Sequence, residues 1–453
     1  MFTLVDGFFS TPSNYLILPA NFIVAALLVG QFHLPPGIYG LIVALPFIIN
    51  FLQAFVMPVM SRRFALKKLV VTGCVVMALA WGALGLLLPF FPRDNPRLSG
   101  VNFVIFFVII SASVSVVGVN WTSWVREWVP ASLRGAFFGK RNRAVQFSQI
   151  AFVFLAGWLL DHLNGALIAF QILFVVSMLM RVISAVCIQK VHPPPPGPAH
   201  VENVAGWRGH LRILLRTPPY IWFVLYGMAW GFAANCSGAF FPVFIYTIMN
   251  LSAQDLGILV ILSSLGGALS FPAWGALGDR FGNKPVMLLC MIAWQLQNFA
   301  WCFLVPGHNW PLYIMWSFGG IVAGGFTVTF FNIQLKVIPP AAKTLAISIN
   351  LALTSVVTAI APILSGAILE YFLNGDPAHD LAVYRFFFLS TPVLGLLACL
   401  ILRKVHEPAA SPLSSVVGAM RNLRTLSSIL GVGFLVDTIF LKRPGMTKKE
   451  TDK

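Results

Sequence analysis

Apolar segments long enough to cross a lipid bilayer recur along the whole chain. A helix needs about 20 mainly apolar residues to span the hydrocarbon core of a membrane. That length selects twelve segments, and the stretches between them contain most of the charged residues. The segments lie at residues 13–32, 37–60, 68–91, 101–124, 138–160, 166–189, 219–246, 255–277, 285–305, 311–335, 343–372 and 383–403. The pattern therefore predicts an all-α integral membrane protein with twelve transmembrane helices.

The composition supports a membrane location. Hydrophobic residues make up 58% of the chain and charged residues only 10%, whereas a soluble domain has about 25% charged residues. So little charge cannot cover a surface that faces water. The net charge of +16 would suggest nucleic acid in a soluble protein, but here the charges lie between apolar segments, so we expect no nucleic-acid partner.

The positions of Lys and Arg predict the orientation of the chain. Alternate connecting segments and the C-terminal tail hold 26 of the 30 Lys and Arg residues. Because positive loops remain in the cytoplasm, we expect both termini there, in a multi-pass protein of the bacterial inner membrane. The basic segments are 61–68, 125–143, 190–216, 278–284, 336–343 and 403–453.

The two halves of the chain resemble each other. Residues 157–161 (GWLLD) match residues 366–370 (GAILE) at an offset of 209, and Val129-Pro130 matches Ile338-Pro339 at the same offset. The sequence KVHP after the sixth predicted helix recurs as KVHEP after the twelfth. These matches predict two six-helix repeats that run parallel.

The repeats imply a division of the chain into four parts. We expect six-helix bundles at 1–190 and 218–404, joined by a Pro-rich cytoplasmic linker at 191–217. The basic end of the linker, 207–216, suits a short amphipathic helix on the membrane surface. A cytoplasmic tail at 405–453 follows, and we place its apolar stretch 423–441 in the interface or the cytoplasm.

A loop between the eighth and ninth predicted helices suggests a family. Residues 275–284 read GALGDRFGNK, which resembles the signature loop of the major facilitator superfamily, G-x-L-(G/A)-D-R-x-G-x-(K/R). Residues 129–135 (VPASLRG) also resemble that superfamily. With the twelve spans and the repeat, the resemblance covers nearly the whole chain. It implies a secondary transporter that moves a small organic solute by alternating access.

The same resemblance implies that these loops latch the cytoplasmic side while the outside is open. The equivalent first-half loop has Arg62 where an acid is expected, and Glu127 aligns with Lys336 at offset 209. We therefore expect two opposite-charge pairs, Arg62–Glu127 and Asp279–Lys336, although ordinary cytoplasmic charges would give the same pattern. The candidate gating residues are Arg62, Glu127, Arg134, Gly275, Asp279, Arg280, Gly282, Lys284 and Lys336.

Arg181 is the one charged residue deep inside a predicted span. It lies about 12 Å from the inner end of the sixth helix at the rise of 1.5 Å per residue. A charged side chain at depth is a candidate for function, so Arg181 could bind a substrate anion. Extension toward the interface, or a hydrogen bond to a neighbouring helix, would also explain it.

Other candidate binding residues follow from the implied fold, in which helices 1, 4, 7 and 10 line a central cavity. Neutral donors and aromatic faces there suit a neutral or amphipathic solute such as a sugar. Each of them could equally join helices to one another. The candidates near mid-depth are Asn21, Gln149, Tyr226, Trp230, Asn235, Trp316, Thr327, Thr354 and Thr358.

Ion coupling is not evident from the sequence. Proton-coupled members of the superfamily usually place a carboxylate or histidine at mid-membrane, whereas the acids and histidines here fall in predicted loops, tails or end turns. We therefore expect uniport or exchange. The rival is that Asp161 or Glu370 lies deeper than expected and carries a proton.

Enzyme motifs are missing from the sequence. It has no HExxH, GxSxG or Walker A motif, and its six cysteines lie singly in apolar runs. We expect no enzyme activity, no cofactor and no metal, with a small-molecule substrate and the bilayer as partners of a monomer. A non-transporting receptor or scaffold of the same fold is the alternative, followed by an integral-membrane enzyme.

Overall fold

A computed structural model describes residues 2–19, 21–129, 131–191, 207–339, 343–407 and 410–420. The described helices of the first half are α1 (Phe2–Tyr15), α2 (Phe22–Ala25), η1 (Ala26–Gln31), α3 (Pro36–Arg63), α4 (Leu66–Leu87), η2 (Leu88–Phe90), α5 (Pro96–Trp128), α6 (Ala131–His162) and α7 (Leu167–Gln189). Those that follow are α8 (Trp207–Leu215), α9 (Pro218–Gly238), α10 (Phe241–Thr247), α11 (Ala253–Phe281), α12 (Asn283–Asn298), η3 (Phe299–Phe303), α13 (Trp310–Val337), α14 (Lys343–Phe372), α15 (Pro377–Leu402) and α16 (Leu413–Met420).

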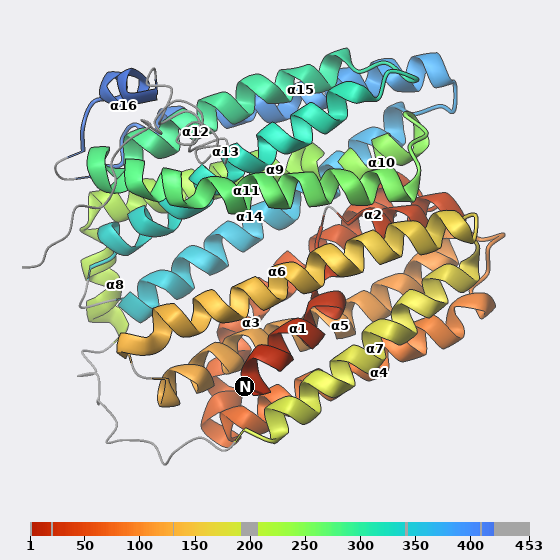
Figure 1. The fold of residues 1–453 in the computed structure, drawn as a ribbon, viewed down its shortest axis with the longest axis horizontal. Coiled ribbons are helices and arrows are strands. Elements are labelled where there is room, and N and C mark those ends of the chain that lie inside the picture. Colours follow the sequence, from red (N-terminus) through yellow and green to blue (C-terminus); the bar gives the residue numbers. More distant parts are fainter. Residues whose placement is uncertain are drawn as a thin grey trace, which may run out of the picture.

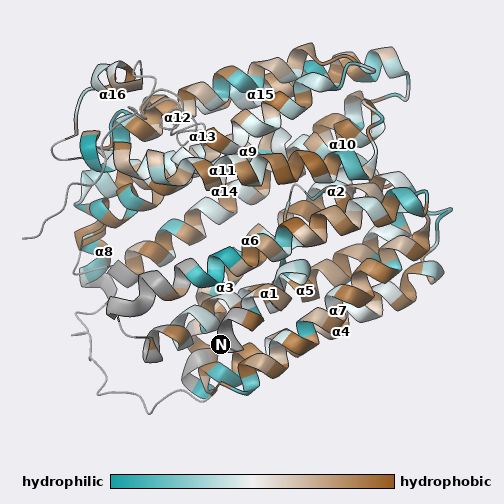
Figure 2. Cartoon of the chain, viewed as in Figure 1, coloured by the Kyte–Doolittle hydropathy of each residue, from teal (hydrophilic) through white to brown (hydrophobic). Residues whose placement is uncertain are grey.

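Twelve spans cross the molecule, as the apolar pattern predicts. Eleven segments of the described chain are helical, long and apolar enough to cross a membrane. Figure 2 shows their interiors as mostly hydrophobic and their ends as more polar. The twelfth span is the first in the chain, and it is assembled from α1, α2 and η1.

The first span is interrupted, and it starts earlier than predicted. Its helix begins at Phe2 rather than near residue 13, and it breaks between Tyr15 and Phe22. The Asn21 side chain bridges the break, because it accepts a hydrogen bond from the Ile23 N–H and donates one to the Tyr15 carbonyl, both at 2.9 Å.

The early start corrects the expectation that no acid lies inside the bundle. Asp6 is on α1 and is only 2% exposed. The hydroxyls of Ser10 and Thr11 donate to the Gly7 carbonyl of the same helix, and the Ser184 hydroxyl of the distant helix α7 donates to Asp6. Hydropathy alone therefore misses this part of the helix.

The spans form two bundles that lie side by side (Figure 1). Helices α1 to α7 make the first half and α9 to α15 the second, and the halves meet where α3 packs along α14 and α6 along α11. The fold is thus the two-repeat, twelve-span arrangement that the sequence predicts.

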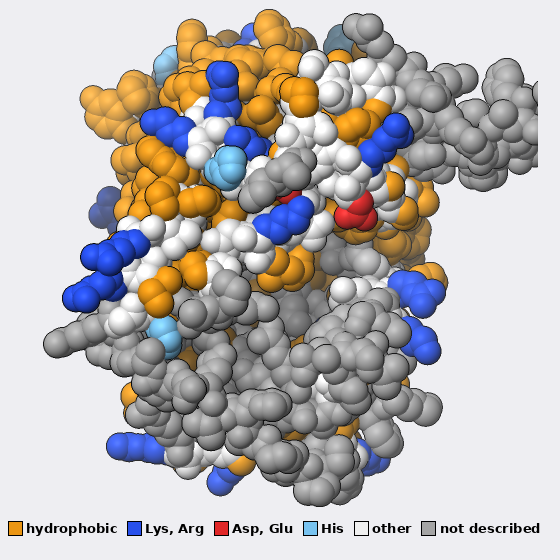
Figure 3. Space-filling view, turned by 90° about the vertical axis from the view of Figure 1, so that its left-hand side faces the viewer, with side chains coloured by type: hydrophobic (Ala, Val, Ile, Leu, Met, Phe, Trp, Pro, Cys, Tyr) orange, Lys and Arg blue, Asp and Glu red, His pale blue; other side chains and the backbone are white. Residues whose placement is uncertain are grey.

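Positive charge collects at one end of the bundles, which we call the basic end. There α3, α7, α11, α13 and α15 finish, and α4, α9 and α12 begin. Figure 3 views this end and shows many Lys and Arg side chains and few acids. We call the other end of the molecule the opposite end.

Two expectations for the segments outside the spans have different outcomes. A short helix, α8 (Trp207–Leu215), does form after the linker. The Pro-rich part of the linker, residues 192–206, and the apolar stretch 423–441 lie outside the described residues.

Candidate functional site

The two halves close on each other at the opposite end through two carboxylates. Asp161, at the end of α6, accepts hydrogen bonds from the N–H groups of Ala253 and Gln254 at 2.9 Å each, at the start of α11. Glu370, at the end of α14, accepts one from the Gly37 N–H at 3.0 Å, at the start of α3. Each carboxylate therefore caps the N-terminus of a helix in the other half, where the helix dipole favours negative charge. We call them the cross-half caps.

A glycine four residues before each carboxylate allows this close approach. A Cβ on Gly157 would lie 2.9 Å from the Ala253 carbonyl oxygen, and a Cβ on Gly366 would overlap the Pro36 carbonyl. The repeated pattern of glycine and acid, GWLLD and GAILE, is thus a pair of equivalent contacts across the seam. The sequence shows the repeated glycine and acid, but it does not show which N–H groups the acids bind.

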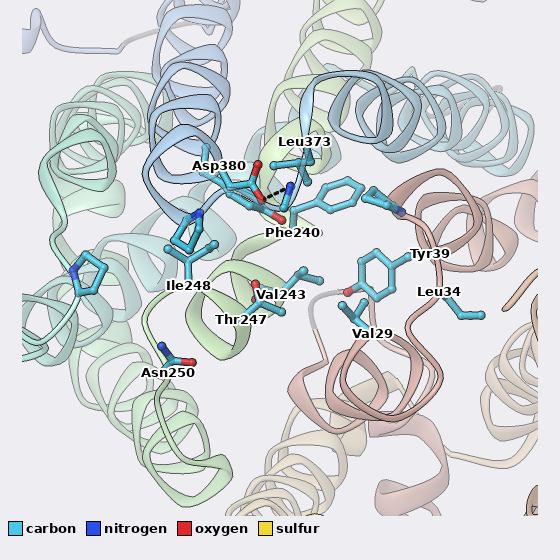
Figure 4. A pocket seen from close by; sticks show the side chains of 15 residues that line it. Val29, Leu34, Tyr39, Phe240, Val243, Thr247, Ile248, Asn250, Leu373 and Asp380 are labelled. Atoms are coloured by element: carbon cyan, nitrogen blue, oxygen red, sulfur yellow. Dashed lines mark hydrogen bonds between the residues drawn. The ribbon is translucent and has the colours of Figure 1, made fainter. Parts of the chain in front are cut away.

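A cavity of about 510 Å³ lies beside this closure, toward the opposite end. Figure 4 shows Val29 and Tyr39 of the first half across from Val243 and Thr247 of the second. The Tyr39 hydroxyl donates to the Ala239 carbonyl at 2.9 Å, which joins the halves again at this level. The cavity is therefore a vestibule outside the closed seam.

A second cavity lies between the halves on the side of the basic end. It measures about 370 Å³ and is formed by α3, α5 and the start of α4 from the first half and by α14 from the second. Its described lining carries no charge: the polar residues are Asn50, Gln53, Asn120, Ser123 and Ser348, and the others are Ala54, Met57, Leu66, Val119, Leu351 and Ala352. We call it the central cavity.

Gln53 is the residue of the central cavity best placed for a ligand. Its Oε1 atom is buried and has no hydrogen-bond partner in the described part of the chain. By contrast, Asn50 accepts from the Ser115 hydroxyl at 3.0 Å, and Asn120 donates to the Val116 carbonyl at 2.8 Å. A buried, unsatisfied carbonyl oxygen is costly, so a ligand hydroxyl or amine would find an acceptor here.

Four of the predicted binding residues bond within their own span or pack between helices. Asn21 spans the break in the first helix, and the Asn235 amide donates to the Gly231 carbonyl of its own helix at 3.0 Å. Thr354 and Thr358 on α14 pack against Gly227 and Gly231 on α9. The two threonines thus show the interhelical alternative that the sequence left open.

The predicted aromatic residues lie within the second half. Tyr226 is fully buried, and its hydroxyl has no hydrogen-bond partner among the described residues. The Trp230 ring packs 5.3 Å from those of both Trp294 and Phe326. Trp316 lines a separate cavity of about 170 Å³ with Trp301 and other residues. None of them reaches the central cavity, and neither does the half-buried Gln149 on α6 or the exposed Thr327 on α13.

At the basic end, Lys336 binds an acid that the sequence did not single out. Its Nζ atom is 2.8 Å from Oε1 of Glu407, whereas Asp279 is exposed and forms no ion pair within the described residues. The predicted Asp279–Lys336 pair is therefore not formed in this conformation. The side chains of Arg62, Glu127 and Arg134 lie outside the described part of the structure, so the first-half pair stays a prediction.

Glu407 caps the N-terminus of α12. It accepts hydrogen bonds from the Asn283 and Lys284 N–H groups at 3.1 and 2.6 Å, and from the Asn283 side chain at 3.2 Å. Burial alone would raise the pKa of this carboxyl, but the bonds from Lys336, Lys284 and Asn283 together lower it below its usual value. The signal in the sequence is the extra glutamate of KVHEP relative to KVHP.

The remaining predicted gating residues shape the turn that Glu407 holds. Gly282 joins α11 to α12 with φ +94°, which other residues rarely adopt. Lys284 donates to the Arg403 carbonyl at 2.8 Å, and the Arg280 guanidinium lies 5.0 Å from the Phe281 ring centre. Gly275 faces open space on α11.

Comparison with known families agrees with this architecture. The sequence profile of the Major Facilitator Superfamily matches residues 7–254 and again residues 231–442. The chain belongs to the Major Facilitator Superfamily. Members of this superfamily are transporters rather than enzymes. The family resemblance and the expectation of no enzyme activity, which rested on the missing enzyme motifs, are therefore confirmed.

Individual relatives of this superfamily member are distant. The citrate-proton symporter of Salmonella typhi is 24% identical over 233 residues, which cover 49% of this chain and 48% of the symporter. The chain thus spans about half the length of this curated relative.

Solved structures share the fold. A D-xylose-proton symporter superposes with a TM-score of 0.70 at 15% identity, over 90% of this chain and 99% of the other. A bacterial homolog of the human lysosomal transporter Spinster, in an inward-facing and unoccupied conformation, gives 0.69 at 16% identity, over 90% and 98%.

Proposed function

We propose that this superfamily member carries a neutral or amphipathic small solute, such as a sugar, by alternating access through the central cavity. The observation that supports this most directly is the uncharged lining of that cavity, which both halves contribute while the opposite end is closed. Uncharged hydrogen-bonding groups in an otherwise apolar cavity suit a solute with hydroxyl groups. The D-xylose-proton symporter of the same fold acts on such a solute by its name.

The orientation of the proposed transporter follows from its charges. We place the basic end and both termini in the cytoplasm of a bacterial inner membrane, because Lys and Arg gather at that end. The central cavity then opens inward and the vestibule lies outside. Domains at 1–190 and 218–404 move against each other as a monomer, and the 191–217 linker joins them.

The proposed mode is uniport or exchange, with three carboxylates to be tested as proton carriers. Asp161 and Glu370 lie at the opposite end, where they accept backbone hydrogen bonds. Asp6 lies inside the first half, next to two arginines. A carrier must gain and lose its proton in each cycle, whereas each of these groups is held by donors in the present conformation.

Ligand screening in detergent tests the substrate class. D-xylose, D-glucose, uridine and citrate are added to the purified protein, because a ligand of the folded state raises its thermal stability. A neutral solute is expected to raise the thermal stability of the protein. Gln53→Ala should weaken the binding of that solute about tenfold, because one hydrogen bond in a buried site is lost. Ser264→Ala is the matched control, since that hydroxyl binds its own helix. Stabilisation by citrate alone would contradict the proposal.

Proteoliposomes test the mode. The stabilising solute should exchange across the membrane, and an imposed pH gradient alone should not drive its accumulation. If the gradient does drive accumulation, and Asp6→Asn, Asp161→Asn or Glu370→Gln abolishes it while exchange survives, then that carboxylate couples transport to protons and uniport is wrong.

A further inference from the structure

A cavity inside the first half brings together three ionisable side chains that the proposed transport path does not use. It measures about 300 Å³ and lies among α1, α5, α6 and α7. Asp6 comes from α1, Arg141 from α6 and Arg181 from α7. The carboxylate is 2% exposed, Arg181 is 1% exposed and the Arg141 side chain 18%.

The hydrogen-bonding groups around this cavity are not satisfied by one another. Oδ1 of Asp6 accepts from the Ser184 hydroxyl at 2.6 Å. Its Oδ2 lies 3.6 Å from Nη2 of Arg141, which is an ion pair but too long for a hydrogen bond. In the described part of the chain, Nε of Arg141 and both Nε and Nη2 of Arg181 have no hydrogen-bond partner.

The charges around the cavity do not cancel either. Two guanidinium groups, which keep their protons, face one carboxylate, and the rest of the described lining is uncharged: Ser10, Asn14, Val114, Val117, Gly118, Trp121, Thr122 and Ile188. An excess positive charge in a buried, largely apolar site is costly unless an anion compensates it. Free N–H groups, free volume and excess positive charge thus coincide in one place.

We propose that this cavity binds a small monovalent anion, held by the guanidinium groups of Arg141 and Arg181. A carboxylate suits the paired N–H groups of an arginine, and chloride would meet the same donors. The site is separate from the central cavity, because α5 divides them. Asn120 and Ser123 line the central cavity, whereas Gly118 and Trp121 line this one.

The cavity wall has an opening through which an anion can enter. Gly118 is exposed, and a Cβ built on it would meet no atom within 4 Å, so the wall is open at that point. Arg141 is partly exposed and its guanidinium lies 4.1 Å from the Trp121 ring centre, which keeps it extended at the rim. Arg181 lies deeper and provides the unpartnered donors.

Thermal unfolding in detergent tests the site independently of transport. Sodium chloride and sodium acetate are titrated separately to about 100 mM, at a constant ionic strength set by the bulky HEPES anion. A ligand that binds only the folded protein raises its unfolding temperature in a saturable way. We expect that response in the natural protein. Its absence with both anions would overturn the proposal.

Three variants distinguish an anion site from a purely structural ion pair. Arg181→Gln should abolish the saturable response. Asp6→Asn should instead increase the apparent affinity by about tenfold or more, because the competing negative charge is removed. Arg385→Gln is the matched control: this arginine lies in the second half, away from the cavity, and its Nη2 donates to the Leu304 carbonyl at 3.0 Å, so the response should remain.

The outcomes separate the possible sources of the anion. A response to chloride indicates a free inorganic ion, and a response to acetate alone indicates the acid group of an organic solute. An equal response in Arg181→Gln would refute the site. If Arg181→Gln does not fold, the comparison between Asp6→Asn and the natural protein still decides, because a structural pair predicts no gain in anion affinity.

Discussion

Carboxylates cap helix N-termini at both ends of the molecule, but they join different parts. At the opposite end, Asp161 and Glu370 reach helices of the other half. At the basic end, Glu407 caps α12 of its own half. Caps across the seam must break each time the halves separate, whereas a cap within one half need not. Asp161 and Glu370 therefore set the balance between conformations, whereas Glu407 contributes to the stability of its own bundle.

The two cross-half caps also differ from each other. Asp161 meets two N–H groups, because Ala253 and Gln254 both have one free at the start of α11. Glu370 meets only Gly37, because the first position of α3 is Pro36, which has no N–H. Glu370 therefore accepts one backbone hydrogen bond across the seam, whereas Asp161 accepts two.

The largest effect is expected from filling the glycine at the seam. Gly366→Ala places a methyl group against the Pro36 carbonyl, and such overpacking costs about 1–3 kcal/mol. The closed opposite end should become about tenfold less populated or worse. A membrane-impermeant reagent added on the side of the opposite end should then modify Ala352→Cys, in the central cavity behind the closure, correspondingly faster.

The matched control for this change is Gly238→Ala. A Cβ there meets only the Phe241 ring, at 4.0 Å, so the reactivity of Ala352→Cys should stay the same. Equal reactivity in both variants would show that the glycine does not govern closure.

Next in size is the loss of the cap within one half. Glu407→Gln should lower stability by about 1–3 kcal/mol, mainly through the bonds to Asn283 and Lys284, because Lys336 is half-exposed and its attraction is screened. The thermal midpoint in detergent should fall while the reactivity of Ala352→Cys is unchanged. Asp279→Asn, at an exposed acid, is the control and should leave the midpoint unchanged.

The stability contributed by Glu407 should also depend on pH. Its pKa is lower in the folded protein than its usual value of 4.5. The contribution is therefore complete above the unfolded pKa and is lost as pH falls through the folded pKa. The difference in midpoint between the natural protein and Glu407→Gln should shrink below about pH 4.5. A constant difference at every pH would argue against an ionised cap.

A smaller effect separates the two cross-half caps. Asp161→Asn removes charge from two hydrogen bonds and should raise the reactivity of Ala352→Cys about tenfold, whereas Glu370→Gln, at an exposed acid with one bond, should raise it about threefold. Thermal midpoints should change little in either. Similar reactivities in the two variants would mean that the number of N–H donors does not matter.

The smallest effect is expected from a substitution that adds a second N–H donor for Glu370. Pro36→Ala adds an N–H at the first position of α3, next to the Gly37 N–H that Glu370 binds, and should reduce the reactivity of Ala352→Cys by about twofold to fivefold. The same change in a Glu370→Gln background should have a smaller effect, since the acceptor charge is gone. A loss of closure in Pro36→Ala would show instead that the rigid proline positions the helix.

The sequence predicts the fold well because its signals are local. Apolar length predicts twelve spans, eleven of which are long apolar helices in the described chain, and the loop GALGDRFGNK indicates the superfamily. The first span is the exception: Asp6 and its neighbouring hydroxyls make the turn look polar, and only partners on distant helices explain why it is buried.

The sites were less predictable because they depend on which faces of the helices meet. Asn120 and Gln53 lie on predicted helices, yet nothing local shows that they share a cavity with Ser348. Arg181 was identified by its depth, but its neighbours Asp6 and Arg141 come from helices far away in the sequence. Glu407 was visible only as an insertion in a repeat.

The cross-half caps have a consequence for evolution. Each carboxylate binds main-chain N–H groups, so the side chains of Ala253 and Gln254 can be exchanged without loss of the bond, provided that the new residue fits and is not proline. Gly37 must stay a glycine, because a Cβ there would overlap the Glu370 carboxylate. The acid positions are constrained while the positions of Ala253 and Gln254 drift. Among homologues these contacts should therefore leave almost no correlated substitutions, and methods that infer proximity from covariation should underestimate how closely the two halves meet at this end.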